Sequence, residues 1–435
     1  MKQYEKYKDS ELPWLEKMPT EWKVLKAKYF MKEINEKSEK GNEKLLSVSE
    51  YYGIKPREQV IEKDDFLSHA DTLEGYKKCF RGDIVMNIML AWKKSLGMSD
   101  YNGIVSPAYS VFRLSNENIP KFFHYFFRTD LLAGEFKRYS TGIIESRLRL
   151  YPDTFLSLKF PVPPKVQQEE IVKNLDKQSQ KINSLIEKRK KMTELLKEER
   201  AAIINQAVTK GINPKAKMKE SGIEWIGKIP EDWNIKRLAS LGKFSKGSGI
   251  SRENLTEEGQ PVILYGDIYT KYNIRTTKVV SHISLETAKN SVSLTKGDLL
   301  FTGSGETVED IGKTIVYDGD ERVFVGGDII IFSPENQDNL FLAYSLNSSA
   351  SQFQKILYAR GEIIVHISAS KLKNLLVPVP PILEQKQIVK YIETETSKID
   401  ETLVKIEKEI ALLEEYKTAL ISEAVTGKID VRNVA

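Results

Sequence analysis

The side chains in this sequence that could do chemistry are mostly lysines, arginines and tyrosines, and they gather in short clusters. Lysine and arginine suit contacts to phosphate groups, and arginine, lysine and serine can also reach the edges of nucleic-acid bases. In the first half of the chain the candidates for contacts to a nucleic acid are Lys78, Arg81, Lys93, Lys94, Arg147 and Arg149. In the second half they are Tyr265, Lys271, Arg275, Lys313, Arg360, His366 and Lys371. Solvation explains any one of these side chains equally well, so the interpretation depends on the clusters.

One cluster also predicts its own local structure. In Arg147-Leu148-Arg149 charged and apolar residues alternate. Successive side chains of a β-strand point to opposite faces of a sheet. The order therefore predicts a strand with both arginines on one face.

Residues 301–305, Phe-Thr-Gly-Ser-Gly, have the F-x-G-x-G form of a loop that binds S-adenosylmethionine in adenine methyltransferases. The catalytic N-P-P-Y or D-P-P-Y motif that accompanies such a loop does not occur in the sequence. A phosphate loop of the G-x-x-x-x-G-K-[ST] type is also missing from the sequence, which argues against ATP chemistry. We interpret residues 301–305 as a strand followed by a glycine turn.

Residue types that bind metals or act as nucleophiles are few. The four histidines, His69, His124, His282 and His366, do not have the spacing of a metal site. Cys79 has no histidine arrangement that would activate a thiol, so we expect a buried structural cysteine. The sequence thus predicts no catalytic residue, no cofactor and no metal, and a protein that is not an enzyme by itself.

The composition is that of a folded protein with a mild positive charge. The chain has 435 residues, of which 40% are apolar and 29% charged, and a formal charge of +5. This length suits two or three domains, and the charge permits a nucleic-acid partner without demanding one. A single cysteine excludes an internal disulfide, and no segment approaches the ~18 to 20 apolar residues of a membrane span. We expect a cytoplasmic protein with no membrane partner.

The chain contains an internal repeat. Pro161-Val162-Pro163-Pro164 returns at 378–381, an offset of 217 residues that holds without a gap as far as 207–209 and 424–426. Trp14 and Trp22 return as Trp225 and Trp233, an offset of 211 residues. Two similar frames therefore hold inserts that differ in sequence and length, as expected when one scaffold presents two different recognition surfaces.

Each repeat ends in a segment that predicts a long helix. Residues 165–209 and 382–426 lack proline and glycine, and each follows a Pro-Pro pair and precedes a glycine. Apolar residues recur every seven positions, which predicts helices that supercoil on a partner and are roughly 60 Å long. The two rows are Leu175, Ile182, Arg189, Leu196 and Ile203, and Ile392, Ile399, Ile406, Leu413 and Leu420.

Two pairings of these helices are open. If they pair with each other in antiparallel fashion, they form a spacer with a pseudo-two-fold axis between the repeats. If each pairs with another chain, they form a homodimer. The matching apolar rows favour the internal pair.

The inserts predict α+β domains. Strands are expected at 82–86, 111–113, 278–280, 297–301 and 328–332, and helices near 119–139 and 337–358. Gly82-Asp83 and Gly297-Asp298 introduce matching strands, so the two domains are expected to share a fold. The predicted order is a first recognition domain at 1–164, a helix at 165–209, a linker at 210–222, a second recognition domain at 223–381, a helix at 382–426 and a tail at 427–435.

Taken in order, these features resemble the DNA-specificity subunit of type I restriction-modification systems, over essentially the whole chain. No single motif decides the resemblance, but their order, which occurs twice with a long helix after each set, is highly specific. The motifs lie at 13–22 and 224–233, 81–85 and 296–307, 103–109, 141–150 and 360–368, and at the helix starts 166–171 and 384–389. The helix start at 166–171 is the less typical of the two.

The resemblance implies a function without catalysis. Each recognition domain would read one half of a gapped site in double-stranded DNA. The helices would set the gap and dock two methyltransferase subunits, and separate ATP-dependent restriction subunits would cleave or translocate. It also adds Ser106, Tyr109 and Ser304, which lie in the family's motifs, to the DNA-binding candidates. The alternatives are a coiled-coil scaffold whose paired domains bind proteins, and a free-standing DNA-modifying enzyme, which the missing motifs disfavour.

Overall fold

The structure is a computed structural model that describes residues 2–60, 72–308, 310–361 and 364–432. His69, residues 362–363 of the motif at 360–368, and the last three residues of the predicted tail lie outside this part of the chain. The chain divides into two compact units, the first made of Met1–Lys190 and Glu407–Ala435 and the second of Lys191–Ile406. None of the described helices is both long and apolar enough to span a membrane.

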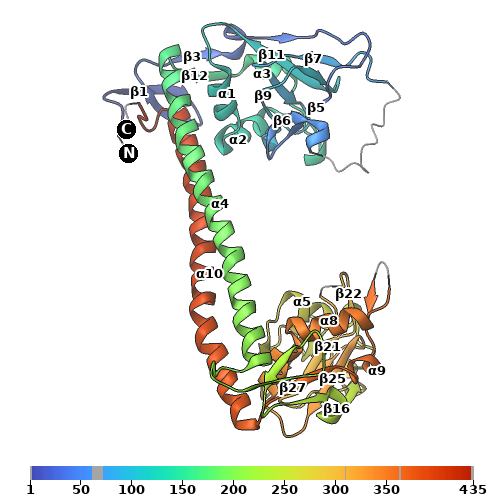
Figure 1. The fold of residues 1–435 in the computed structure, drawn as a ribbon. Helices are drawn as coiled ribbons and strands as arrows, with labels where there is room; N and C mark the ends of the chain where they lie inside the picture. Colours follow the sequence, from blue (N-terminus) through green and yellow to red (C-terminus); the bar gives the residue numbers. More distant parts are fainter. Residues whose placement is uncertain (1, 61–71, 309, 362–363, 433–435) are drawn as a thin grey trace. The chain divides into compact units, whose positions relative to one another are not determined.

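The first unit is built on a four-stranded antiparallel sheet with helices packed on it (Figure 1). Its strands, in spatial order, are β4 (Met31–Ile34), β11 (Tyr109–Leu114), β8 (Ile84–Asn87) and β9 (Leu96–Met98). The helices are α1 (Pro120–Phe127), α2 (Asp130–Tyr139) and α3 (Pro152–Ser157). A cluster of phenylalanines fills the core; Phe122, Phe123, Phe126 and Phe127 of α1 are fully buried in it.

Short strand pairs surround this sheet. They are β1 (Tyr7–Leu12) with β2 (Leu15–Pro19), β3 (Lys23–Lys26) with β12 (Lys159–Val162), β5 (Leu46–Ser49) with β6 (Gly53–Pro56), and β7 (Lys77–Cys79) with β10 (Gly103–Val105).

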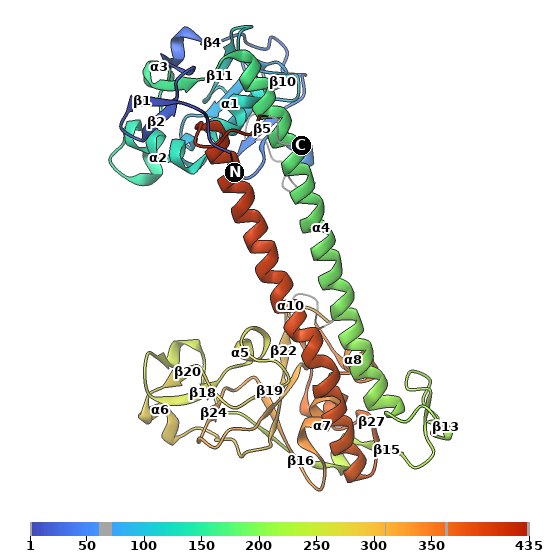
Figure 2. The same cartoon turned by 90° about the vertical axis from the view of Figure 1, so that its left-hand side faces the viewer.

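The second unit repeats this plan with a larger strand content, and Figure 2 shows its smaller sheet beside α5 and α6. The larger sheet has the order β16 (Gly242–Lys246), β25 (Ile329–Pro334), β21 (Leu299–Thr302), β23 (Thr314–Tyr317) and β19 (Arg275–Thr276). The smaller sheet has the order β17 (Leu255–Thr256), β20 (Ser281–Ile283), β18 (Gln260–Ile263) and β24 (Phe324–Val325).

The remaining elements of this unit are helices and three strand pairs. The helices are α5 (Tyr265–Thr270), α6 (Leu285–Lys289), α7 (Asn339–Leu346), α8 (Ser349–Tyr358) and α9 (Ala369–Leu372). The strand pairs are β13 (Met218–Glu220) with β14 (Lys228–Pro230), β15 (Asn234–Arg237) with β27 (Leu376–Val379), and β22 (Ser304–Gly305) with β26 (Val365–His366).

The frames of the two units agree residue by residue. In the first unit Val24 pairs with Pro161 between β3 and β12, and in the second Ile235 pairs with Pro378 between β15 and β27. These pairs follow the two sequence offsets of 211 and 217 residues. Gly82 and Gly297, which precede β8 and β21, both have φ of +94°, a conformation that favours glycine. The expected matching strands are therefore present.

Two long helices belong to both units, and their ends match the sequence signals. Helix α4 spans Lys165–Lys210 and α10 spans Ile382–Val425, so each begins directly after a Pro-Pro pair. Gly211 and Gly427 follow them with φ of +74° and +76°, the left-handed conformation common after a helix. The Cβ that a larger residue would add at Gly427 would meet the Pro19 ring at 2.4 Å, so this helix end is closely packed.

Within each unit the two helices are tied by polar contacts. In the first unit, Asn183 of α4 accepts a hydrogen bond from Lys417 of α10 (2.8 Å), and the Arg189 guanidinium lies 2.9 Å from the Glu409 carboxylate. Residue numbers rise along α4 as they fall along α10, so the segments run antiparallel in this unit. The polar residue at position 189 of the apolar row therefore has an acidic partner on the other helix.

Two predicted strands are absent. Residues 278–280 follow β19 without strand pairing because the Thr276 hydroxyl donates to the Lys278 carbonyl (2.7 Å) and closes a local turn. Residues 145–147 form a 3₁₀ turn, in which the Arg147 amide donates to the Ile144 carbonyl (2.9 Å). The prediction that Arg147 and Arg149 share one strand face is therefore wrong.

Candidate nucleic-acid interface

The second unit has a pocket of about 470 Å³ where β21, β22 and β26 end. Four of the candidates from the sequence, Ser304, Arg360, His366 and Lys371, line it together. The remaining lining residues are Lys246, Gly303, Asp328, Ile330, Tyr358, Ile367, Ser368 and Ala369. Its ionisable rim is mainly cationic and exposed, which suits contact with a polyanion.

Backbone pairing fixes the two sides of this pocket. Ser304 of β22 pairs with His366 of β26, and the Ser304 hydroxyl lies 2.9 Å from Nδ1 of the His366 ring. The Arg360 amide donates to the His366 carbonyl (3.0 Å), and the His366 amide donates back to the Arg360 carbonyl (2.7 Å). Backbone and side-chain bonds therefore hold Ser304, Arg360 and His366 next to one another, as groups that read base edges must be.

Buried polar groups support the pocket from behind. The Tyr269 hydroxyl contacts the Thr302 hydroxyl (2.7 Å) and the carbonyls of Ser304 (3.0 Å) and Asp310 (3.2 Å), and so fixes the glycine turn. Burial raises the pKa of Tyr269, which keeps this hydroxyl a hydrogen-bond donor. The Lys313 ammonium donates to the Tyr272 carbonyl (3.0 Å), and burial lowers its pKa. Lys313 therefore contributes to the support and is not free at the rim.

The first unit has an equivalent hairpin, formed by residues 141–149 and called the exit hairpin below. The amides of Thr141 and Arg149 donate to each other's carbonyls (2.9 and 3.0 Å), as those of Arg360 and His366 do in the second unit. The Leu150 amide donates to the Ile88 carbonyl (2.8 Å), the counterpart of the bond from Ile367 to Gly303 (2.9 Å).

These bonds equate positions of the two units. Arg149 occupies the place of His366, Thr141 that of Arg360, and Met89 that of Ser304. Both Arg147 and Arg149 are exposed. The two arginines thus lie on the hairpin that corresponds to the one beside the pocket of the second unit, although their backbone conformation was predicted wrongly.

A cation cluster lies beside the exit hairpin. The ammonium groups of Lys93 and Lys137 lie 5.1 and 5.0 Å from the centre of the Trp92 ring. Lys137 also forms an ion pair with Glu145 of the hairpin, which lowers the pKa of that carboxyl. Lys93 also contributes to the lowered pKa of the Glu145 carboxyl, so its charge lies close to the exit hairpin.

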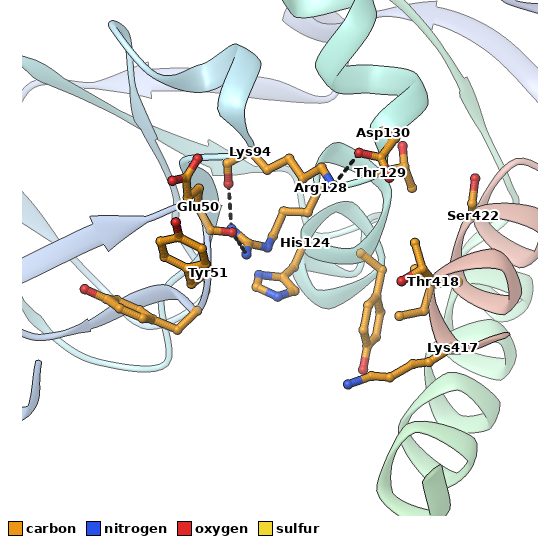
Figure 3. A pocket seen from close by; sticks show the side chains of 13 residues that line it. Glu50, Tyr51, Lys94, His124, Arg128, Thr129, Asp130, Lys417, Thr418 and Ser422 are labelled. Carbon is orange, nitrogen blue, oxygen red and sulfur yellow. Dashed lines mark hydrogen bonds and ion pairs between the residues drawn. The ribbon is translucent and has the colours of Figure 1, made fainter. Parts of the chain in front are cut away.

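Other candidates make contacts within the protein. Lys94 reaches Asp130 (2.5 Å), as Figure 3 shows, and its backbone is left-handed with φ of +62°. Lys271 pairs with Asp267 (2.9 Å), and Arg275 pairs with Glu393 of α10 (3.4 Å). Only the pair of Lys271 with Asp267 could be anticipated from local sequence. Asp267 lies in α5, and Lys271 follows it by four residues, directly after the helix.

The last candidates are spread over the surfaces of their units. In the first unit Arg81 is exposed before β8, Lys78 is half-buried near Glu43 (3.9 Å), and Ser106 lies in a turn. Tyr109 is half-buried, and burial raises the pKa of its hydroxyl. Tyr265 is 40% exposed at the start of α5.

The pocket in Figure 3 is lined mainly by exposed and half-buried groups of the first unit, two of which, Arg128 and His124, stabilise it from within. The Arg128 guanidinium donates to the carbonyls of Ser49, Glu50, Lys94 and Leu96 at 2.6 to 3.2 Å. His124 accepts a bond from the Met98 amide (3.2 Å), and burial lowers its pKa to about 3, so the ring is neutral. We assign both residues to structural roles.

Cys79 is buried as expected, and burial raises the pKa of its thiol to about 12. Such a thiol is a poor nucleophile. Among the described residues, no group of three or more histidine, cysteine or acidic side chains could hold a metal ion.

Sequence reasoning missed several residues of the interface. In the second unit these are Lys246, Asp328 and Tyr358, which line the pocket. The internal repeat held a signal for Tyr358. A tyrosine ends the corresponding helix in both units, Tyr139 in α2 and Tyr358 in α8. No comparable signal marked Lys246 or Asp328, whose positions depend on the sheet.

The comparison with known families gives two matches within this chain. The family described as type I restriction modification DNA specificity domain matches residues 22–195 and again residues 230–412. Together these ranges cover most of the chain, and each contains the insert of one repeat and much of the long helix that follows.

Individual relatives agree with this match. The MjaVIII specificity subunit of a type I restriction enzyme from Methanocaldococcus jannaschii is 24% identical over 96% of this chain and 95% of that protein. The MjaX specificity subunit from the same organism is 27% identical over 63% of this chain and 60% of its own length. The EcoKI specificity subunit from Escherichia coli is 23% identical over 47% of this chain and 44% of its own length.

Two solved structures share the fold. One is a chain from a study of assembly and conformational transition in a type I restriction-modification system, with a TM-score of 0.70 and 16% identity over 94% of this chain and 99% of that one. The other is the HsdS subunit from Thermoanaerobacter tengcongensis, with a TM-score of 0.54 and 16% identity over 94% of this chain and 98% of that one.

Proposed function

Because this chain belongs to the family of type I restriction-modification DNA specificity proteins, we propose that it is the non-catalytic subunit that directs such a complex to its DNA site. Each unit reads one half of a gapped double-stranded sequence. The observation that carries this proposal is the double family match, since the model of the DNA specificity domain matches this chain twice.

The differences between the two units support separate half-sites. The frame residues and the hydrogen bonds that close the two hairpins agree, whereas the side chains at the equivalent positions 149 and 366, 141 and 360, and 89 and 304 do not. Hydrogen-bonding and apolar side chains at groove edges discriminate between bases. Two different sets of such side chains on one scaffold are expected to select two different half-sequences.

We further propose that α4 and α10 pair as an antiparallel coiled coil and set the gap between the half-sites. In the first unit Ile182 and Ile186 of α4 are buried, and in the second Ile392 and Ile399 of α10 are buried. Arg200 and Asp400 make a further interhelical ion pair in the second unit (2.8 Å). Readers that approach one face of B-DNA need half-sites about one turn, ~34 Å, apart.

The same helices offer surfaces for partners. Leu195, Leu412 and Tyr416 expose 52%, 53% and 47% of their area on α4 and α10. Exposed apolar side chains on a charged helix suit a protein partner. We propose that two methyltransferase subunits bind there and methylate adenine, and that restriction subunits add ATP-dependent translocation or cleavage.

The gap is tested by shortening both helices equally. Deleting residues 187–193 and 404–410 removes one heptad from corresponding places of α4 and α10. Seven residues at ~1.5 Å each span about three base pairs, so we expect methylated sites with the same bases and a shorter gap. Methylation-sensitive sequencing of host DNA measures this, and an unchanged gap would contradict the proposal.

A further inference from the structure

We infer that the exit hairpin of the first unit, residues 141–149, inserts Ile143 between two stacked base pairs of its half-site. The inference rests on the proposed function and adds a mechanism to it. It depends on the shape of the hairpin, the exposure of its tip and the charges around it.

The hairpin is a tight and rigid support. Thr141 and Arg149 close it with two backbone hydrogen bonds, and Arg147 donates to the Ile144 carbonyl within the tip. A Cβ at Gly142 would lie 2.6 Å from the Arg147 carbonyl oxygen, so the two sides of the hairpin approach as closely as a glycine permits. A side chain at the tip is therefore presented on a fixed backbone.

The tip is apolar and fully open. Ile143 exposes 99% of its area, more than any other large apolar side chain in the described part of the chain, and Ile144 exposes 52%. Burial of such side chains is favourable by ~25 cal/mol per Å², so this tip gains free energy when an apolar surface covers it. The stacked faces of bases offer such a surface.

The charges around the tip favour duplex DNA as the ligand that covers it. Arg147 and Arg149 are exposed in the hairpin itself, and Lys93 lies on the neighbouring Trp92 ring. The one acidic side chain of the hairpin, Glu145, is paired with Lys137. An apolar tip flanked by cations is the arrangement that kinks DNA from the minor groove, where the wedge enters between bases and the cations contact bases and phosphates.

The second unit has a hairpin with a similar base. Gly361 begins the equivalent hairpin with φ of +122°, and its Cβ would meet the Ile364 carbonyl oxygen at 2.0 Å. Ile364 exposes 53% of its area, and Arg360 and His366 take the places of Thr141 and Arg149. The Ile364 carbonyl faces Gly361 as the Arg147 carbonyl faces Gly142, so Ile364 takes the place of Arg147, and the likeness of the two hairpins concerns their base.

The test uses the full chain co-produced with the methyltransferase subunits of its own system. Duplexes carry 2-aminopurine, which fluoresces when unstacked, at successive positions of the first half-site other than the methylated adenine. We expect the wild-type complex to raise the fluorescence at one base step, and Ile143→Ala to reduce that rise at least about threefold. Ile143→Leu should restore it.

The control is Leu285→Ala, which removes a side chain that is 63% exposed in the second unit. It should leave the fluorescence in the first half-site unchanged. Since Ile143 makes few contacts in the free protein, its alanine variant is expected to fold normally.

The outcomes separate this inference from the proposed function. If Ile143→Ala binds and methylates the site and leaves the fluorescence as in the wild type, the wedge is overturned and the proposed function stands. If Ile143→Ala instead loses the methyltransferase subunits from the complex, the tip contacts protein and the wedge is also overturned. If the wild-type complex shows no preference for its methylated sequence, the proposed function fails and the wedge with it.

Discussion

The two units of this chain have one frame and two different surfaces at the interface. In the first unit the Gln168 side chain accepts from the Ile119 amide (2.8 Å) and donates to the Pro163 carbonyl (2.9 Å). In the second, Gln385 makes the same bonds to Asp338 and Pro380, each at 2.9 Å. These glutamines tie the start of each long helix to its unit.

The interface positions show the opposite behaviour. At equivalent backbone positions, the first unit has an arginine (149) where the second has a histidine (366). It has a methionine (89) where the second has a serine (304). The frame residues are buried and make hydrogen bonds within the protein that a substitution would break. The interface residues are largely exposed, so their side chains are constrained mainly by the ligand that they bind. The two repeats thus share the same backbone geometry, while the side chains at the interface differ in chemical type.

We expect the largest loss of stability when either of the two buried tryptophans of the frame is replaced. Trp22 and Trp233 are 0% and 1% exposed and donate to Gln167 (2.9 Å) and Glu384 (3.0 Å), respectively. Replacement of either by alanine should cost about 3–5 kcal/mol of stability in its own unit. Hydrogen exchange of β8 and β21 peptides reports each unit separately.

A matched control keeps an aromatic ring at each position. Trp22→Phe and Trp233→Phe should lose much less protection than the alanine variants. Equal loss of protection in both units after one alanine substitution would contradict the assignment of each tryptophan to one frame.

A smaller effect should distinguish the cores of the units by pH. The seventh residue of α2 is Phe136, and the seventh of α8 is Lys355, which is fully buried. Burial lowers the pKa of Lys355 from 10.5 to about 7, and its ammonium donates to the Gly312 carbonyl (2.5 Å). Between these two pKa values the unfolded chain holds more protons than the folded one.

Stability of the second unit should therefore rise with pH between about 7 and 10, by up to ~1.4 kcal/mol per pH unit from this group. Below pH 7 both states are protonated and the dependence from Lys355 disappears. Hydrogen exchange of peptide 313–317, corrected for the intrinsic rate, measures the rise, and Lys355→Met should flatten it. A variant with the wild-type slope would refute this account of Lys355.

The sequence alone was enough where a local signal and a packing requirement coincide. Pro164 and Pro381 marked the starts of α4 and α10, and Gly211 and Gly427 marked their ends. The strands after Gly82 and Gly297 were also predicted, because these glycines adopt a backbone conformation that other residues avoid.

The sequence was insufficient where distant segments meet. Arg275 was a candidate for DNA, but its charge faces Glu393, which is far away in the chain. The conformation of 145–149 was mispredicted because a hairpin turn with a 3₁₀ tip overrides the alternation of charged and apolar residues. The pocket itself brings together β21, β22 and β26, and no local pattern foretells that meeting.

The separate reading of two half-sites is tested most directly by sequencing the methylated sites of three chains: wild type, Arg149→Ala and His366→Ala. Loss of one such contact to a base should weaken discrimination by ~1–3 kcal/mol at its own position. We predict a gapped motif in which Arg149→Ala relaxes or weakens one half, and His366→Ala the other, with the gap unchanged. If both substitutions altered the same half, or if neither altered the motif, the two units would not be separate readers.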